Sequence, residues 1–189
     1  MDYRVNDFIT LFNAFWYRDF PVSLSGIDFA KRADWTTHIA TSVRQVASLM
    51  GLFSCFESGG RTDAELQFAN RKVWAKLEWE WEEPRDNRVG EIAKLAAAAS
   101  DCDVCAYIGY SSTGHHEVNL EKIRAAWHGV HKPLLVMLVT FELDGNWRCF
   151  DQLKTYSFDG HGFTLLREQP ALPWSAPLSR WQVDAGLVG

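Results

Sequence analysis

The sequence predicts an α/β fold with a mixed central β-sheet flanked by helices. Segments with apolar residues at helical spacing alternate with short segments that are continuously apolar or strictly alternating, as strands are. Three strand-like segments come in succession between residues 52 and 81, and their short spacers predict antiparallel pairing. Strand–helix–strand steps follow, and these predict parallel pairing with helices on the sheet faces.

The individual elements follow from their patterns. Residues 7–20 carry a helical apolar stripe, so we expect an N-terminal helical segment over about residues 1–20. Asp34 can cap a second helix that ends at Gly51, where a residue tolerant of positive φ is preferred. Strands are expected at 52–57, 61–68, 72–81, 104–110, 133–143, 147–158 and 163–168. Two more helices are expected at 89–99, where Asp86 or Asn87 can be the cap, and at 118–130. An irregular, Pro-rich tail follows over about 168–189.

The composition is that of one globular domain of 189 residues, with 47% hydrophobic and 23% charged residues. The net charge of −5 argues mildly against a protein that grips nucleic acid through its phosphates. No apolar run approaches the roughly 20 residues that cross a bilayer, and the N-terminus lacks the features of a signal peptide. We therefore expect a cytoplasmic protein that has no membrane partner and keeps its four cysteines reduced.

The segment "KLEWEWEE", residues 76–83, alternates acidic and apolar side chains. In a strand, Lys76, Glu78 and Glu80 would share one face with Trp74 and Glu82, while Leu77, Trp79 and Trp81 would face the core. A strand in the middle of an α/β sheet is covered on both faces, so a polar face there needs a reason. Like charges along one face repel one another, and a solvated surface softened by Arg71, Lys72 and Lys76 remains the plain alternative.

A metal site would supply that reason. Asp63 lies on the preceding hairpin strand, and a suitable register would bring it beside Glu78 and Glu80. Such carboxylates suit Mg²⁺ or Mn²⁺, which complete their shells with water and substrate phosphate. In this interpretation Asp63 and Glu78 hold the metal, Glu80 completes the shell or orients the water, and Lys76 positions the water or the phosphate.

The pattern of Asp63 in "RTDAEL" followed by Glu78-Trp79-Glu80 in "LEWEW" resembles the PD-(D/E)xK nuclease superfamily, over roughly residues 35–140. The resemblance implies a restriction-endonuclease-like fold and a single nuclease-like domain spanning residues 1–189. It adds Glu57 as an upstream acidic ligand. The usual lysine of the motif is Glu80 here, as in some restriction enzymes with Glu-x-Glu, and in members whose lysine has moved to the next helix the counterpart would be Lys94.

The function that this resemblance implies is metal-dependent hydrolysis of phosphodiester bonds in nucleic acid, with DNA favoured over RNA. A second class remains open: a catalytically inactive nuclease-like domain that binds a protein partner or a second copy of itself. The acidic net charge, the Glu-x-Glu departure and the nine Trp residues favour this alternative.

Two other groups of reactive side chains have structural interpretations as well. Cys102 and Cys105, together with His128 and His131, have the chemistry of a zinc set, but Cys105 lies in an apolar strand and a structural role is favoured. The segment 111–119, "SSTGHHEVN", brings serines and histidines together at the entry of a helix. A Ser–His nucleophile or a phosphate contact beside the metal is the functional alternative to a solvated loop there.

Overall fold

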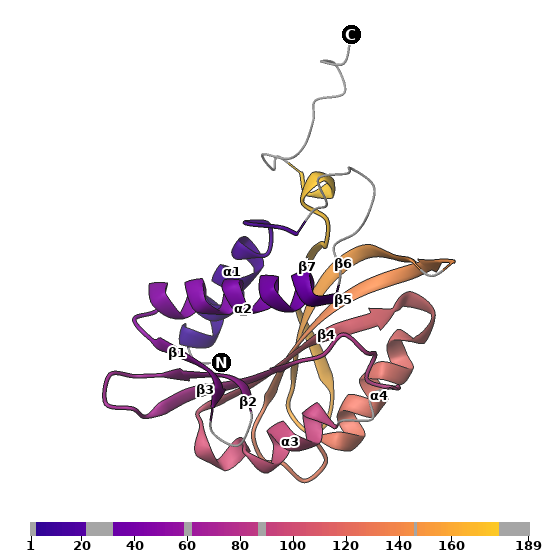
Figure 1. Ribbon diagram of the computed structural model, residues 1–189. Helices are drawn as coiled ribbons and strands as arrows, with labels where there is room; N and C mark the ends of the chain where they lie inside the picture. The colour runs from indigo at the N-terminus through magenta and orange to yellow at the C-terminus, as the bar shows by residue number, and fades with distance from the viewer. Residues whose placement is uncertain (1–2, 22–31, 59–61, 87–89, 146, 178–189) are drawn as a thin grey trace.

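The fold is α/β, with a seven-stranded mixed sheet and four α-helices, as the sequence predicts (Figure 1). The structure is a computed structural model, and it describes residues 3–21, 32–58, 62–86, 90–145 and 147–177. The α-helices are α1 (Tyr3–Phe15), α2 (Arg32–Leu49), α3 (Glu91–Ala97) and α4 (His116–Ala126). The strands are β1 (Phe53–Ser58), β2 (Thr62–Gln67), β3 (Val73–Trp79), β4 (Val104–Ser112), β5 (Leu134–Asp144), β6 (Trp147–Phe158) and β7 (Phe163–Pro170).

The strands lie side by side in chain order, from β1 to β7. β1, β2 and β3 pair antiparallel, as their short connections require. β3, β4 and β5 pair parallel, because α3 and α4 carry the chain back to the start of each next strand. β5, β6 and β7 are antiparallel again. Helices α1 and α2 cover one face of the sheet and α3 and α4 cover the other (Figure 1).

Each face of the sheet has its own hydrophobic core. The core under α1 and α2 is rich in aromatic residues, and Trp16, Trp35 and Phe12 are almost fully buried there. The core under α3 and α4 contains Tyr107 and Trp127. The interior of β3 is therefore enclosed on both faces, which is the condition under which charged side chains need partners.

Several element boundaries differ from the sequence expectation. Helix α2 is described from Arg32, which places Asp34 in its first turn. Helix α3 begins at Glu91, after Gly90 with a left-handed φ of 74°, and the expected cap at Asn87 lies outside the described residues. The C-terminal segment is ordered further than expected, because β7 continues to Pro170 and a short 3₁₀ helix spans Pro173–Ser175.

A β-bulge in β3 overturns the expected position of Trp74. Leu66 pairs with Ala75 and Gln67 pairs with Val73, which leaves Trp74 as the extra residue. A bulge breaks the strict alternation of side chains. Trp74 therefore joins the core under α1, with its ring 6.0 Å from that of Phe8, and does not share a face with the charged residues of β3.

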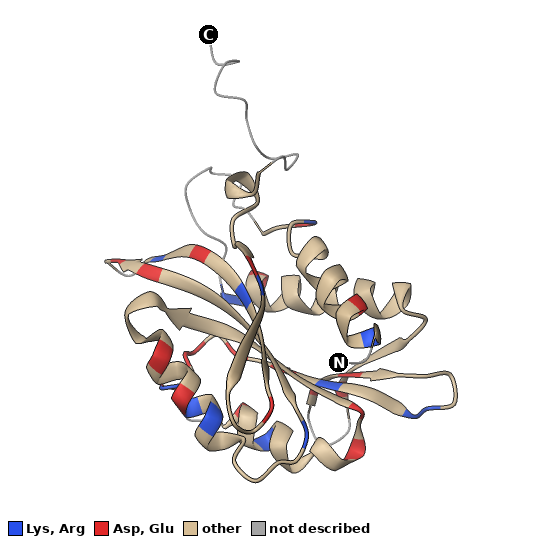
Figure 2. Ribbon diagram, turned by 180° about the vertical axis from the view of Figure 1, so that it is seen from behind, with Lys and Arg blue, Asp and Glu red and all other residues tan. Residues whose placement is uncertain are grey.

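Charged residues are arranged along α4 in the order that favours a helix. Glu117 and Glu121 come in its first part and Lys122 and Arg124 in its second, as the red and blue bands of Figure 2 show. Negative charge near a helix N-terminus and positive charge near its C-terminus complement the helix dipole. None of the helices in the described part of the chain is long and apolar enough to cross a membrane.

Candidate acidic site

The pairing of β2 with β3 brings Asp63 and Glu78 together. Ala64 pairs with Leu77 and Glu65 with Lys76, so the residues one step further along each strand lie beside one another. The carboxylate of Asp63 also accepts a hydrogen bond from the backbone N–H of Trp79 at 2.8 Å. This register is the one that the metal hypothesis needs.

Helix α3 adds two further charged groups to the same place. Lys94 Nζ lies 3.0 Å from Glu78 Oε2 and 2.8 Å from Glu91 Oε2. Glu91 and Lys94 are three residues apart and so lie on the same side of the helix. Asp63, Glu78, Glu91 and Lys94 form the acidic cluster, which thus unites two antiparallel strands and the helix that follows them.

Burial and mutual repulsion control the protonation of this cluster. The side chain of Glu78 is fully buried. Desolvation, together with the neighbouring carboxyls of Glu91 and Asp63, raises the pKa of Glu78 to about 9, although Lys94 acts to lower it. Glu78 therefore holds a proton at neutral pH, and its hydroxyl can donate to an adjacent carboxylate.

The other members of the cluster shift in the same electrostatic field. Burial also raises the pKa of Asp63, an effect limited by the hydrogen bond from Trp79 and the charge of Lys94. Burial acts to lower the pKa of Lys94, but the contacts with Glu91 and Glu78 outweigh it and raise that pKa. Lys94 is therefore a stable cation held against two carboxyls.

Buried polar atoms around the cluster lack hydrogen-bond partners among the described residues. These atoms are both carboxyl oxygens of Glu78, Oε2 of Glu91 and the hydroxyl of Tyr107. Two of these oxygens, Glu78 Oε2 and Glu91 Oε2, nevertheless lie 3.0 and 2.8 Å from Lys94 Nζ. Tyr107 pairs with Glu78 in the β3–β4 register, and burial together with the charges of Glu80 and Glu91 raises the pKa of its hydroxyl. Unsatisfied buried groups of this kind are costly unless water or an ion meets them.

The donor chemistry of the cluster suits a hard cation. Its oxygens come from the carboxyls of Asp63, Glu78 and Glu91, and carboxylate oxygen is a donor type that Mg²⁺ accepts. Within the described ranges, no three His, Cys, Asp or Glu side chains stand together as a complete set of metal ligands. Mg²⁺ commonly uses only one or two protein carboxylates and completes its shell with water and phosphate, so Asp63 and Glu78 would be sufficient.

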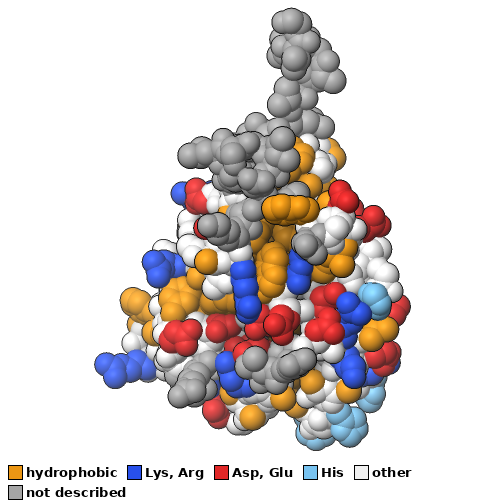
Figure 3. All heavy atoms as spheres, turned by 45° about the vertical axis from the view of Figure 1, so that its right-hand side comes forward, with side chains coloured by type: hydrophobic (Ala, Val, Ile, Leu, Met, Phe, Trp, Pro, Cys, Tyr) orange, Lys and Arg blue, Asp and Glu red, His pale blue; other side chains and the backbone are white. Residues whose placement is uncertain are grey.

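The remaining acidic residues of the strand do not converge on this cluster. Glu80 Oε1 lies 2.7 Å from Arg32 of α2, and it also accepts hydrogen bonds from the backbone N–H groups of Trp81 and Glu82. Glu80 is thus neutralised by Arg32 at the end of the strand. Figure 3 shows that acidic side chains form a band on one face of the protein and that Lys and Arg side chains lie close to this band.

Lys76 belongs to a separate buried ion pair. Its Nζ lies 3.3 Å from Glu65 Oε1 and 3.7 Å from Asp101 Oδ2. Both Lys76 and Glu65 are about 95% buried, and the charge of Lys76 neutralises that of Glu65. Lys76 lies two residues before Glu78 on β3. The like charges of the alternating strand are therefore tolerated because Lys76, Lys94 and Arg32 each stand beside a carboxyl.

Glu57, the upstream acidic residue, lies outside the acidic cluster. Its side chain is exposed, and its backbone has a left-handed φ of 51°. The described part of the structure records no contact between Glu57 and the cluster. Of the residues named from the sequence, the structure thus brings together Asp63, Glu78 and Lys94, and leaves Glu57, Glu80 and Lys76 apart.

Two residues of the site were not recognised in the sequence. Glu91 could have been found from the Glu-x-x-Lys spacing that it forms with Lys94 on one side of a helix. Tyr107 gave no such signal, because it lies inside an apolar strand. Only the parallel register with β3 brings its side chain next to Glu78.

The serines and histidines of segment 111–119 belong to a hydrogen-bond network in which the serines are buried, His116 is partly buried and His115 is exposed. Ser111 Oγ lies 2.9 Å from His116 Nδ1, whose other ring nitrogen lies 2.8 Å from the hydroxyl of Tyr156. Asn119 joins Ser111 to Glu83 through contacts of 2.9 and 2.7 Å. These contacts tie β4, α4 and β6 together, which gives the network a structural role.

Glu83 holds this network together. Its Oε2 accepts hydrogen bonds from the N–H and hydroxyl of Ser112 at 2.7 and 2.8 Å and from Asn119 at 2.7 Å, while Arg85 lies 3.2 Å from Oε1. Burial acts to raise the pKa of Glu83, but these hydrogen bonds outweigh it and lower that pKa. Glu83 is therefore ionised, in contrast to Glu78 five residues earlier.

Substituting Glu83 by Gln should lower the free energy of unfolding by about 2 kcal/mol at pH 7, because hydrogen bonds to a buried charge are lost. A carboxyl with a lowered folded pKa stabilises the protein above its unfolded pKa, so the deficit should shrink as the pH falls below about 4.5. Urea unfolding at several pH values measures it, and the exposed Glu82→Gln is the control. An unchanged stability would show that Glu83 does not organise the network.

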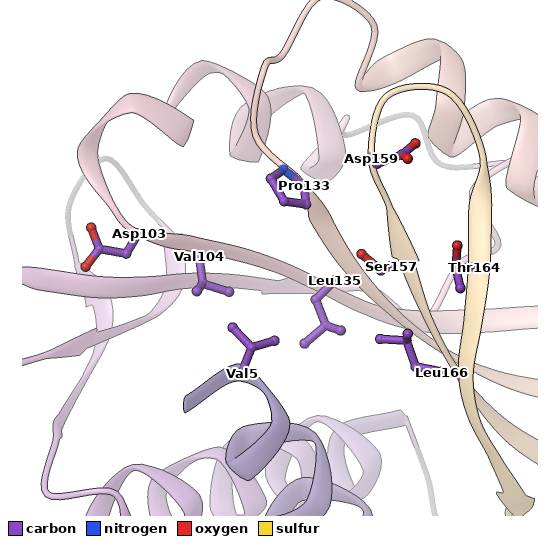
Figure 4. A pocket seen from close by; sticks show the side chains of 9 residues that line it. All are labelled: Val5, Asp103, Val104, Pro133, Leu135, Ser157, Asp159, Thr164 and Leu166. Carbon is purple, nitrogen blue, oxygen red and sulfur yellow. The ribbon is translucent and has the colours of Figure 1, made fainter. Parts of the chain in front are cut away.

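A cavity lies on the face of the sheet that α1 covers, away from the acidic cluster. It measures about 470 Å³ and is lined by residues from α1, from the starts of β4 and β5, and from β6 and β7 (Figure 4). Val5, Val104, Leu135 and Leu166 give it a mainly apolar wall, with Asp103 and Asp159 nearer its rim. The wall of this cavity is mainly apolar, whereas the acidic cluster gathers ionisable side chains with shifted pKa values, so the cluster is the better candidate for chemistry.

The fold and the cluster together define an α/β protein with a site of carboxyl groups and one lysine. The site lies where the antiparallel β2–β3 hairpin leads through α3 to the parallel strand β4. No known family model matches the chain. No curated protein matches it either. Among solved structures it is similar to the YaeQ protein from Xanthomonas axonopodis pv. citri, with 9% sequence identity, a TM-score of 0.27, and coverage of 69% of this chain and 77% of that one.

Proposed function

We propose that this protein is a metal-dependent nuclease of the PD-(D/E)xK type, with the acidic cluster as its centre. The observation that carries the proposal is the convergence of Asp63, Glu78 and Lys94, which are the acid of the first hairpin arm, the acid of the second and the displaced lysine. The order α2, β1, β2, β3, α3 and β4, with the hairpin antiparallel and β4 parallel to β3, agrees with the restriction-endonuclease-like arrangement that the resemblance implies.

Each residue of the cluster has a role in this proposal. Asp63 and Glu78 would hold Mg²⁺, which when bound lowers the pKa of a coordinated water and neutralises charge on the phosphodiester. Glu78 must give up its proton to act as a ligand. Lys94 would turn from the carboxyls to the phosphate oxygen on which negative charge develops. Glu91 would accept a proton from the attacking water.

Calorimetric titration with Mg²⁺ tests the site itself. We expect binding that releases a proton, so the affinity near neutral pH should rise roughly tenfold per pH unit while Glu78 is protonated. Buffers with different ionisation enthalpies measure the released proton. Glu78→Gln should abolish the binding, whereas Glu82→Gln, on an exposed side chain of the same acidic run, should preserve it.

A second function has one observation in its favour. Glu78 is protonated and Lys94 neutralises Glu91, so the cluster can exist without a metal. The protein would then be an inactive nuclease-like domain that binds a protein partner, and exposed apolar residues such as Leu143 and Trp147 would be available to it. Absence of any response to Mg²⁺ or Mn²⁺, combined with self-association or a co-purifying protein, would favour this function and contradict the first.

A further inference from the structure

Two cysteines outside the acidic cluster lie close enough to react with each other. Cys102 Sγ and Cys105 Sγ are 3.5 Å apart, and both thiols are free. A disulfide has a sulfur–sulfur distance of about 2.05 Å, so small side-chain rotations of the two residues would close the remaining gap. Cys102 follows the short 3₁₀ helix Ala99–Asp101, and Cys105 is the second residue of β4.

The surroundings make the two sulfurs chemically unequal. The hydrogen bond from Cys105 lowers the pKa of Cys102 against the effect of burial, and the charges of Lys132 and Lys76 lower it further. The contact with Cys102 and burial raise the pKa of Cys105. Cys102 is thus the sulfur whose thiolate form is favoured and Cys105 the thiol in contact with it, which is the division found in reactive Cys-x-x-Cys pairs.

The turn that carries Cys102 lies near the protein surface, between the exposed residues Asp101 and Asp103. An open depression of about 400 Å³, lined by residues that include Ala99, Ser100 and Lys132, adjoins the turn that carries Cys102. The Lys132 ammonium donates hydrogen bonds to the carbonyl oxygens of Ala99 and Cys102. Lys132, which lines the depression, thus contacts the backbone of Cys102 directly. Cys102 is 5% exposed whereas Cys105 is fully buried, so Cys102 is the sulfur that solvent reaches first.

A zinc site does not explain the pair. His128 and His131 are exposed, and the described residues hold no group of three or more His, Cys, Asp or Glu side chains ready for a metal. Lys76 pairs with Glu65 and Lys132 donates to two carbonyl oxygens, and both also place positive charge near Cys102. The short distance, the unequal environments and the access to Cys102 together indicate redox chemistry.

We propose that Cys102 and Cys105 are a reversible dithiol–disulfide pair that hydroperoxides oxidise. The Cys102 thiolate attacks the hydroperoxide oxygen, which gives a sulfenic acid on Cys102 and releases an alcohol or water once the leaving oxygen takes up a proton. The Cys105 sulfur then attacks the Cys102 sulfur, the S–S bond forms, and water leaves. Two electrons pass from the two thiols to the peroxide, and a dithiol reductant reverses the change. This inference is independent of the nuclease proposal.

The test uses the full chain with Cys55 and Cys149 replaced by Ser, so that only the pair can react. After treatment with hydrogen peroxide at a small molar excess, intact-mass analysis should show a loss of about two mass units, no reaction with N-ethylmaleimide, and full recovery with dithiothreitol. Disulfide formation should be at least about tenfold faster in the folded protein than in urea, because thiolate character sets thiol reactivity. Two alkylatable thiols remaining in the folded protein would overturn the proposal.

Single variants then identify the attacking sulfur. In the same background, Cys105→Ser should form a sulfenic acid at Cys102 that dimedone traps, and Cys102→Ser should not form one at Cys105. Trapping at Cys105 alone would overturn the assigned order. Circular dichroism checks that each variant is folded, and the mass change of the chain that retains both thiols decides the main question without either variant.

Discussion

Replacing Asp63 with Asn should reduce Mg²⁺-dependent cleavage of nucleic acid by at least about 100-fold, because metal stabilisation of a phosphoryl transition state is worth several kcal/mol. Asn keeps an oxygen that accepts the hydrogen bond from Trp79 N–H, so the hairpin should keep its geometry. The substitution removes the negative charge of Asp63, which is the member of the acidic cluster that lies on β2. The loss should therefore appear in activity and not in folding.

Cleavage of labelled single- and double-stranded DNA and RNA, with and without Mg²⁺, measures this effect. Asp103→Asn is a matched control, because Asp103 is an exposed carboxylate whose partner is Lys72 at 2.8 Å. Full activity in the Asp63 variant would remove that residue from the centre. If wild-type protein cleaves none of these substrates and does not bind Mg²⁺, the inactive, partner-binding function becomes the better explanation.

Replacing Glu78 with Gln should raise the free energy of unfolding by about 3 kcal/mol at pH 7. The pKa of Glu78 is about 9 in the folded protein and 4.5 for the ordinary carboxyl of the unfolded chain. At pH 7 the folded protein therefore holds a proton that the unfolded chain releases, and this difference lowers stability. Gln has the shape of the protonated carboxyl and does not incur that cost.

The pH dependence identifies the cause. Between about pH 4.5 and 9 the folded state binds more protons than the unfolded state, so the contribution of Glu78 makes wild-type stability fall as the pH rises. The advantage of the Gln variant should therefore vanish near pH 4.5 and grow toward pH 9. Urea unfolding at pH 5, 7 and 8.5 measures it, with Glu82→Gln as the exposed control. An equal effect at all three pH values, or a destabilised variant, would contradict a protonated Glu78.

Gain of stability on removing Glu78, together with loss of Mg²⁺ binding, would be informative about function. Such a result would mean that Glu78 lowers stability while it serves metal binding, which is the trade-off expected where function and stability compete. In contrast, Glu83 is ionised and well hydrogen-bonded, and its removal should weaken the protein. We therefore expect Glu78 to lower the free energy of unfolding and Glu83 to raise it.

Local patterns in the sequence were sufficient for most of the fold. Alternation and helical spacing predicted the strand and helix order, and the short connections predicted which strands pair antiparallel. Leu77, Trp79 and Trp81 lie on the core side, as the alternation of β3 indicates. The bulge at Trp74 could not be predicted, because an extra residue in a strand depends on the pairing with β2 and leaves no mark in the alternation itself.

The partners of each charged side chain depended on tertiary structure. Glu80 turns to Arg32, which is 48 residues away in sequence, and Lys76 turns to Glu65 on the neighbouring strand. A strand pattern states which way a side chain points, but the position of a helix above it decides which cation it meets. For this reason Glu80 could not be separated from Glu78 by the strand pattern alone.

The sequence by itself determined the α/β class, the acidic strand and the presence of Asp63 on the hairpin arm before it. Tertiary structure decided that Glu78 is buried and protonated, that Glu91 and Tyr107 complete its surroundings, and that Lys94 lies 3.0 Å from it. The physical reason is that periodicity fixes the direction of a side chain within an element. Desolvation and Coulomb interactions depend on the distances between elements, which only the packing of β2, β3, β4 and α3 sets.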